Sequence, residues 1–280
     1  MDDTAAHLVD RVLPFAPYRQ WVLSLPFAMR LRLARNDELL GELRRIFIAA
    51  VARWQRKKAR DLGHREVETA AVCPSIRDSR RYSGHGFTQR HDSLLRVNPH
   101  LHSLHPDAVF VESAEGRGEL VALPKPTQAD VEGILRRLVQ RARKLLERFG
   151  EEAEPEDALD RVRGRQLSLF APPKELPEGK LSARLEGYSL HAATHLHMND
   201  REGLERMARY ALRPPVANSR LSQREDGELV LKLKRALPDG RETLELSPME
   251  LMRRLAGLVP RPRVQCTRST TSGRSRATRR

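Results

Sequence analysis

Residues 96–111, RVNPHLHSLHPDAVFV, carry the alternating pattern that decides the fold. Successive side chains of a strand point to opposite faces, so Leu101 turns towards a core while His100 and His102 share the other face. Pro106 and Asp107 divide the stretch into two short strands. Two imidazoles held side by side can supply two ligands of a metal site. The alternative is a chance His-x-His in a chain with ten histidines, and the pattern alone favours that alternative.

A second pair, His195 and His197, lies directly before Asn199, which the sequence predicts as a helix N-cap. A chain that is turning does not hold two side chains parallel, so this pair is the weaker candidate. Serine nucleophiles are not indicated either, because the chain contains no Gly-x-Ser-x-Gly elbow, and no glycine-rich phosphate loop occurs.

Helices and strands alternate irregularly around the histidine stretch. Apolar spacing and N-cap signals predict helices over residues 4–16, 36–60, 127–149, 199–212 and 247–258. Further strands are predicted over 20–26 and 188–192, and the Asp-Gly pairs at 226–227 and 239–240 mark tight turns. The sum is an α+β fold with a mostly antiparallel sheet and flanking helices.

Local changes in amino-acid composition divide the chain into four parts. We expect a first part of the core over 1–149, including the His-x-His strand, and a second part over 181–264. The proline-rich and acidic stretch 150–180 between them predicts a linker or insertion. Residues 265–280 are basic and lack apolar periodicity, so we expect a disordered tail.

Charge is the first indication of a partner. The chain has 51 Lys and Arg against 37 Asp and Glu, a net charge of +14, and 43 of its cations are Arg. Guanidinium groups match phosphate oxygens bidentately, which favours nucleic acid as the partner. The alternative is that a GC-rich genome alone explains the arginine content.

Several classes of protein are disfavoured. The two cysteines, Cys73 and Cys266, exclude a disulfide framework and a four-cysteine zinc site. No stretch approaches the roughly 20 apolar residues of a membrane helix, and the acidic start does not resemble a signal peptide. We therefore expect a cytoplasmic protein with no membrane partner.

Tyr210 stands out on the helix predicted over 199–212. At 100° per residue the apolar stripe contains Leu204, Met207, Ala208, Ala211 and Leu212. Three arginines, Arg206, Arg209 and Arg213, form the opposite face. Tyr210 falls at the boundary, where its hydroxyl can emerge beside guanidinium groups that hold a phosphate. An ordinary boundary tyrosine is the alternative, and composition alone favours it.

Four segments together resemble the rolling-circle transposases of the insertion sequence 91 family, relatives of the ISCR elements. They are RQWVLSLPFAMRLRLA (19–34), NPHLHSLHPDAVF (98–110), SLHAATHLHMNDREGLERMARYALRPPVANSRLS (189–222) and LKRALPDGRETLELSPMELMRRLAGLVPRPR (233–263). The resemblance runs from about residue 3 to residue 264, and its most specific string is Arg-Tyr-x-x-Arg-Pro-Pro at 209–215.

The resemblance implies an HUH endonuclease core that nicks and rejoins single-stranded DNA at transposon ends through a 5′-phosphotyrosine. It implies that His100 and His102 bind a divalent ion, Mg²⁺ or Mn²⁺, and that Tyr210 is the nucleophile. Such sites need a third ligand, and Gln89, 11 residues before His100, is our candidate on a neighbouring strand. Arg206, Arg209 and Arg213 become DNA-binding residues, and no small-molecule substrate is expected.

The sequence also departs from the family. Arg206 stands where members commonly have a second tyrosine, so the chain resembles the single-tyrosine members. It begins after the expected cysteine-rich zinc region, and the tail after Val264 no longer resembles relatives, which predicts a truncated copy. The alternative functions are an inactive DNA-binding remnant and a basic structural or RNA-binding protein. The second is disfavoured because 5% aromatic content leaves few stacking platforms.

Overall fold

The structure is a computed structural model of the 280-residue chain. It describes residues 6–69, 86–92, 94–112, 118–150, 180–212, 215–234, 236–237 and 239–259. Apart from residues 150 and 180 themselves, the predicted insertion over 150–180 lies outside the described residues, and so does the predicted tail over 265–280. The described part has an α+β fold with antiparallel sheets, as the sequence predicted.

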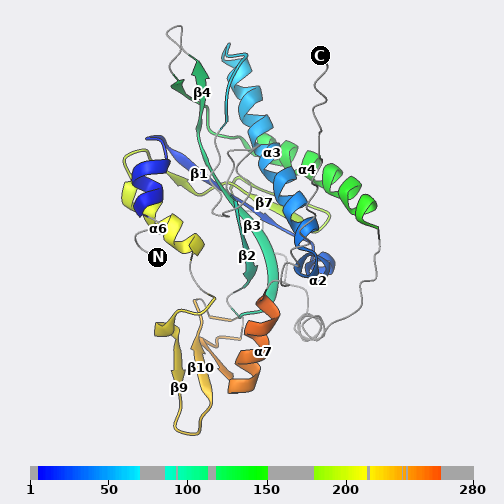
Figure 1. Ribbon diagram of the computed structural model, residues 1–280, viewed down its shortest axis with the longest axis vertical. Coiled ribbons are helices and arrows are strands. Elements are labelled where there is room, and N and C mark those ends of the chain that lie inside the picture. Colours follow the sequence, from blue (N-terminus) through cyan, green and yellow to red (C-terminus); the bar gives the residue numbers. More distant parts are fainter. Residues whose placement is uncertain are drawn as a thin grey trace, which may run out of the picture.

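A central antiparallel sheet has the strand order β2-β3-β1-β7-β6, and the short β8 also pairs with β1 (Figure 1). Its strands are β1 (Tyr18–Ser24), β2 (Gly86–His91), β3 (Val97–Pro106), β6 (Ser182–Leu185), β7 (Tyr188–His191) and β8 (His195–Leu196). Strands from before and after the 150–180 stretch therefore form one sheet. The two predicted strands within 96–111 are confirmed as β3 and β4 (Ala108–Glu112), and β4 forms a hairpin with β5 (Gly118–Ala122).

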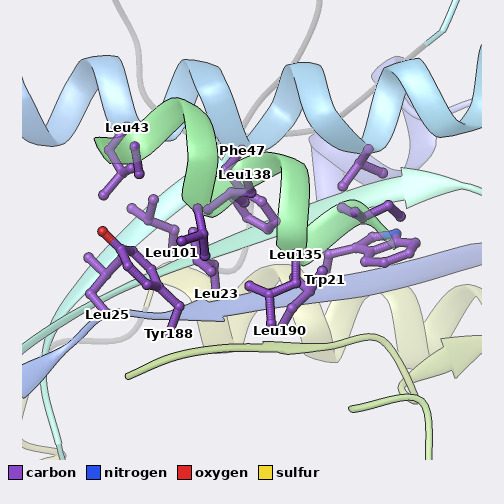
Figure 2. Close-up of a cluster of buried hydrophobic side chains, with 14 of the residues drawn as sticks. Trp21, Leu23, Leu25, Leu43, Phe47, Leu101, Leu135, Leu138, Tyr188 and Leu190 are labelled. Carbon is purple, nitrogen blue, oxygen red and sulfur yellow. The ribbon is translucent and has the colours of Figure 1, made fainter. Parts of the chain in front are cut away.

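Two long helices, α3 (Asp37–Asp61) and α4 (Gln128–Phe149), cover one face of this sheet. Asn36 caps α3 by accepting a hydrogen bond from the Leu39 amide, and Thr127 and Asp130 form the predicted capping box of α4. Figure 2 shows Trp21, Leu23 and Leu101 from the sheet meeting the apolar sides of these helices, including Phe47 and Leu138.

The opposite face carries α6 (Arg201–Leu212), which lies beside the five-residue π-helix η1 (Leu8–Val12) in Figure 1. Leu204 of α6 packs in one cluster with Tyr18 of β1 and Leu104 of β3. The 3-10 turn η2 (Phe27–Met29) and helix α2 (Arg30–Arg35) connect β1 to α3. Among the described residues, no helix is long and apolar enough to span a membrane.

A small C-terminal module follows α6. It consists of the 3-10 turn η3 (Asn218–Arg220), a sheet of β9 (Leu221–Gln223), β10 (Leu229–Lys232) and β11 (Thr243–Leu246), and helix α7 (Pro248–Leu258). Leu95, in the turn between β2 and β3, is buried with Leu231 and Leu246 of this module. Arg254 of α7 donates to the Leu94 carbonyl at 2.9 Å. The module therefore packs against the turn between β2 and β3 and holds it in place.

Three details differ from the sequence prediction. The helix predicted over 4–16 ends earlier, because the π-helix Leu8–Val12 stops before Pro14. The last core helix begins at Arg201, since Asp200 rather than Asn199 accepts the hydrogen bond from the Gly203 amide at 2.8 Å. Strands β5, β6 and β8 were not predicted, because they are two to five residues long and carry little periodic signal.

A buried ion pair joins the segments around β1. Arg19 donates to both carboxylate oxygens of Asp107, with nitrogen–oxygen distances of 3.0 and 2.7 Å, and also to the Ala192 carbonyl at 2.8 Å. The Asp107 amide donates to the Pro17 carbonyl, and the Asp107 carbonyl accepts from the Leu123 amide. Arg19 and Asp107 are only 2% and 4% exposed. This contact therefore fixes β1, the β3–β4 junction and the chain before β8 to one another.

Replacing Arg19 should strongly destabilise the fold. Arg19→Met leaves the Asp107 carboxylate buried without its partner, so we expect the free energy of unfolding to fall by about 3–5 kcal/mol. The double variant Arg19→Met/Asp107→Leu should lose less, because no unpaired charge remains. Urea unfolding measures both. Arg45→Met, at an exposed pair with Glu42, is the control, and an equal loss in the control would contradict the role of the buried pair.

Candidate functional site

The strand register puts His100 and His102 on the sheet face opposite to α3 and α4. In the β1–β3 pairing, Ser24 faces His100 and Val22 faces His102, whereas Leu23 faces Leu101. Leu101 lies fully buried beneath the helices, as the alternation predicted. The two imidazoles therefore lie together, with ring centroids 4.9 Å apart and ring planes 54° apart.

Gln89 lies beside the histidine pair. It faces His100 across the β2–β3 pairing, and its Oε1 atom is 3.2 Å from His100 Nε2. The structure thus brings together the three residues predicted as ligands. Their role as ligands stays a prediction.

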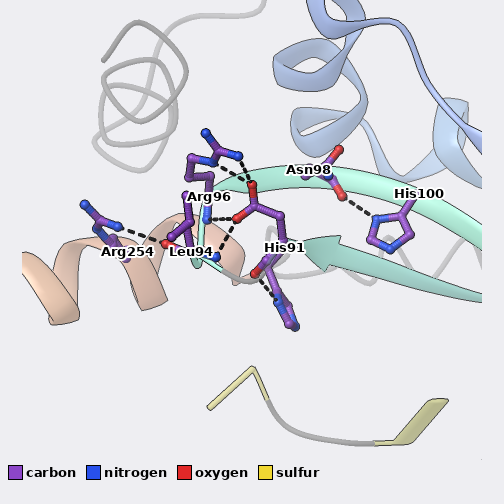
Figure 3. Close-up of polar contacts among 7 residues, drawn as sticks. His91, Leu94, Arg96, Asn98, His100 and Arg254 are labelled. Carbon is purple, nitrogen blue, oxygen red and sulfur yellow. Dashed lines mark hydrogen bonds and ion pairs between the residues drawn. The ribbon is translucent and has the colours of Figure 1, made fainter. Parts of the chain in front are cut away.

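The turn between β2 and β3 holds Gln89 in this register. The Asp92 carboxylate accepts from the amides of Leu94 and Arg96 and from the Arg96 guanidinium. Figure 3 shows Arg96 and Leu94 at this turn, with Arg254 of α7 reaching the Leu94 carbonyl. The register shifts between Gln89 and His91, so this turn and the irregularity beside it together set the pairing of Gln89 with His100.

The contacts of His100 suit a cation. Its Nδ1 atom is 2.7 Å from the Asn98 carbonyl (Figure 3), and its Nε2 atom faces Gln89 Oε1. Burial lowers the pKa of His100, so the ring is neutral and carries one proton. If the proton is on Nδ1, it is donated to the Asn98 carbonyl, which is the shorter of the two contacts. His100 Nε2 then carries a lone pair, and it faces Gln89 Oε1, which is also a hydrogen-bond acceptor. A cation bound by both atoms, or a rotated Gln89 amide, satisfies this arrangement.

The separation of these two atoms also fits a metal site. Adjacent ligands of an octahedral ion at about 2.1 Å lie roughly 3.0 Å apart, close to the 3.2 Å between Gln89 Oε1 and His100 Nε2. Among the described residues, no group of three or more His, Cys, Asp or Glu side chains could hold a metal ion. Gln89 Oε1, which contacts His100, is therefore our candidate for the third ligand, and these three donors carry no negative charge.

Gln20 is a site residue that the sequence interpretation missed. Its Nε2 atom is 3.2 Å from His102 Nδ1, so the amide orients the second imidazole. Burial, and then the neighbouring His100, lower the pKa of His102 to about 3. Alternation along β1 offers the missing signal, because Gln20 and Val22 must point away from the core that holds Trp21 and Leu23.

Helix α6 lies on the same sheet face as the histidine pair. Leu204 packs against Leu104, which points to the same face of β3 as His102, two residues earlier in the chain. Tyr210 belongs to the last turn of α6, but its side chain lies outside the described residues, and so does Arg213. The backbone of the predicted nucleophile is therefore on the histidine side of the sheet.

Two other tyrosines can be set aside as nucleophiles. The Tyr18 hydroxyl donates to the Pro14 carbonyl at 3.1 Å, and burial raises its pKa. The Tyr188 hydroxyl contacts Met29 Sδ at 3.2 Å inside the core, and burial raises its pKa to about 12. Both rings are at most 4% exposed. Neither hydroxyl can reach a DNA phosphate without unfolding the core.

Arg206 and Arg209 are exposed on α6, as predicted, but each has an acidic neighbour one turn earlier. Arg206 lies 3.4 Å from Glu202, and Arg209 pairs with Glu205. Such exposed pairs are weak, so a phosphate can displace the carboxylates. Their contact with DNA stays a prediction.

The second histidine pair does not converge. His195 lies in β8 and its Nε2 atom is 3.5 Å from Asp107, whereas His197 Nδ1 accepts from the Asn199 amide. That this pair is the weaker metal-site candidate stays a prediction. The expected turn is wrong for the first part of the segment, because His195 and Leu196 form a strand.

His105 is the third histidine of β3 and points to the core side with Ser103. Its Nε2 atom is 2.7 Å from Ser103 Oγ, and burial lowers its pKa to about 3. An unfolded histidine has a pKa near 6.5, so between about pH 6.5 and pH 3 the unfolded chain binds the extra proton. His105 therefore makes the fold less stable as the pH falls through this window.

His105→Met should weaken the pH dependence of stability. Between pH 7 and pH 4.5 we expect the free energy of unfolding to fall by roughly 2 kcal/mol less than in the wild type, because one buried imidazole no longer has to be charged on unfolding. Urea unfolding at several pH values measures this. Ser103→Ala is the matched control, since it removes the hydrogen bond and keeps the imidazole. An unchanged pH slope in His105→Met would contradict the assignment.

The chain matches a family of known proteins. Residues 85–272, two thirds of the chain, match the Y2_Tnp family, which is described as "Putative transposase". No curated protein and no solved structure matches. The matched range contains Gln89, His100, His102 and Tyr210, and it continues past Val264 into the tail that we expected to differ. The chain belongs to this family of transposases.

Proposed function

We propose that this transposase nicks and rejoins single-stranded DNA through a 5′-phosphotyrosine, in rolling-circle transposition of the insertion sequence 91 type. The observation that carries the proposal is the cluster of His100, His102 and Gln89 on the sheet face that also bears α6. An HUH endonuclease needs this combination, because ligands and nucleophile must act on one phosphate.

His100, His102 and Gln89 would hold the divalent ion, Mg²⁺ or Mn²⁺. When bound, such an ion polarises a phosphate oxygen and offsets the charge that develops during displacement. Burial keeps both imidazoles neutral and able to bind, and Gln20 orients the second ring. Because all three donors are uncharged, the site should bind an ion tightly only when DNA phosphate contributes an oxygen.

The cleavage step transfers one phosphoryl group. The Tyr210 hydroxyl loses its proton to solvent or a nearby base, and its oxygen attacks the scissile phosphorus. The bond from phosphorus to the 3′ oxygen breaks, and that oxygen leaves with a proton as a free 3′-hydroxyl. The 5′-phosphate remains on Tyr210, so attack by another 3′-hydroxyl reverses the chemistry and joins strands. Arg206, Arg209 and Arg213 would bind the neighbouring phosphates.

Tyr210→Phe should abolish the covalent adduct. The change removes only the hydroxyl, so DNA binding should stay within roughly threefold of wild type. Denaturing gel electrophoresis with labelled single-stranded DNA from the element's ends, in Mg²⁺ or Mn²⁺, detects the adduct. Tyr188→Phe removes a buried hydroxyl and is the matched control, which should keep the adduct. Adduct formation by Tyr210→Phe would exclude this nucleophile, and its absence in wild type would favour the DNA-binding remnant.

The ligand residues should govern metal dependence. His100→Ala should abolish the adduct at any Mn²⁺ concentration, whereas Gln89→Ala should raise the concentration needed for half-maximal activity. Gln89→Glu should lower that concentration, because it adds a negative charge beside the ion. His64→Ala, on the loop after α3, is the control histidine. Equal metal dependence of wild type and both Gln89 variants would remove Gln89 from the site.

A further inference from the structure

A basic hollow lies between α3 and α4, away from the histidine pair. It has a volume of about 430 Å³ and is lined by Arg53, Lys57, Arg60, Asp61 and Arg137. We call these five residues the α3–α4 hollow. Both helices cover the sheet face that holds Leu101, so the hollow is separated from His100 and His102 by the core and the sheet.

The cations of the hollow are arranged in a row. Arg53, Lys57 and Arg60 follow one another at the i, i+4, i+7 spacing that places side chains on one side of a helix. All three are exposed, and so is Arg137 on the neighbouring helix. The same spacing continues from Arg137 through two further exposed cations, Arg141 and Lys144. Two neighbouring helices thus each present a row of exposed cations.

These charges are not neutralised by the fold. Within the described part of the chain, none of the four cations of the hollow forms an ion pair, and Asp61 is its one acidic lining residue. Lys58, by contrast, lies on the inner side of α3 and pairs with Asp130 at 3.1 Å. Four neighbouring cations repel one another, so an anionic partner that binds among them gains electrostatic attraction from all four.

The chemistry of the hollow fits a duplex backbone better than a single strand. Single strands are bound through aromatic platforms as well as charge, and none of the described residues that line the hollow is aromatic. Arg53 to Arg60 spans about 10 Å along the helix axis. Each strand of a duplex carries one phosphate for every 3.4 Å or so of the duplex axis, so a row of this length can reach more than one phosphate.

We infer that the α3–α4 hollow is a second DNA-binding site, which holds the phosphate backbone of double-stranded DNA while the opposite sheet face holds the strand to be cut. The inference relies on DNA as the partner of this transposase family and does not require the tyrosine chemistry. Duplex bound behind the sheet would anchor the protein beside the single strand on which it acts.

The test compares two triple variants that lose the same charge. The first is Arg53→Gln/Lys57→Gln/Arg137→Gln. The control is Arg65→Gln/Arg148→Gln/Lys180→Gln, whose sites are exposed and lie outside the hollow. Fluorescence anisotropy with a labelled duplex of unrelated sequence gives the affinity at several salt concentrations. Circular dichroism and urea unfolding show that each variant is folded.

We expect the hollow variant to lower the slope of log affinity against log salt by about 2–3, near 0.9 for each lost phosphate contact. The control should change it by less than 1, and adduct formation on a short single strand should be unaffected by the hollow variant. Equal slopes in the two variants, or no change in either, would overturn the inference. An equal loss of single-strand binding would overturn the assignment to duplex. Absence of the adduct in wild type bears only on the tyrosine mechanism.

Discussion

The buried contact between Arg19 and Asp107 is the constraint on which the arrangement of the site depends. Asp107 follows directly after β3, the strand of His100 and His102, and Arg19 lies in β1, the strand that pairs with it. Arg19 also holds the Ala192 carbonyl, just before β8 and α6. One guanidinium group therefore links the strand of the candidate ligands to the chain that leads into the helix of the candidate nucleophile. Buried ion pairs add little net stability, and this pair acts by joining three segments that are distant in the chain.

Much of the fold could be predicted because its signals are local. The caps at Asn36, Thr127 and Ser247 mark helix starts within a few residues of sequence, and the alternation around Leu101 distinguishes the core side of β3 from its other side. The convergence of Gln89 with the histidines followed from an expected neighbouring strand. It required the resemblance as well, because spacing alone does not specify which strands pair.

The features that were missed depend on contacts between distant segments. Arg19 and Asp107 are 88 residues apart, and Gln20 and His102 are 82 apart, so no local pattern connects them. The basic rows on α3 and α4 are visible in the sequence as separate helical stripes. Only the packing of the two helices brings Arg137 beside Arg53 and Lys57. Burial of the core is thus predictable from periodicity, whereas polar partners are decided by tertiary structure.

Because side chains alternate along β3, substitutions on its two faces have different consequences for the protein. Loss of Leu101, which is fully buried, opens a cavity that costs about 2–5 kcal/mol and so removes folded chains from the cell. Loss of His100 leaves that core intact. A copy that loses His100 therefore persists as a folded protein that keeps its core and α6. Under the proposed function, such inactive chains still occupy the same DNA ends as active copies in one genome, so their accumulation slows further transposition.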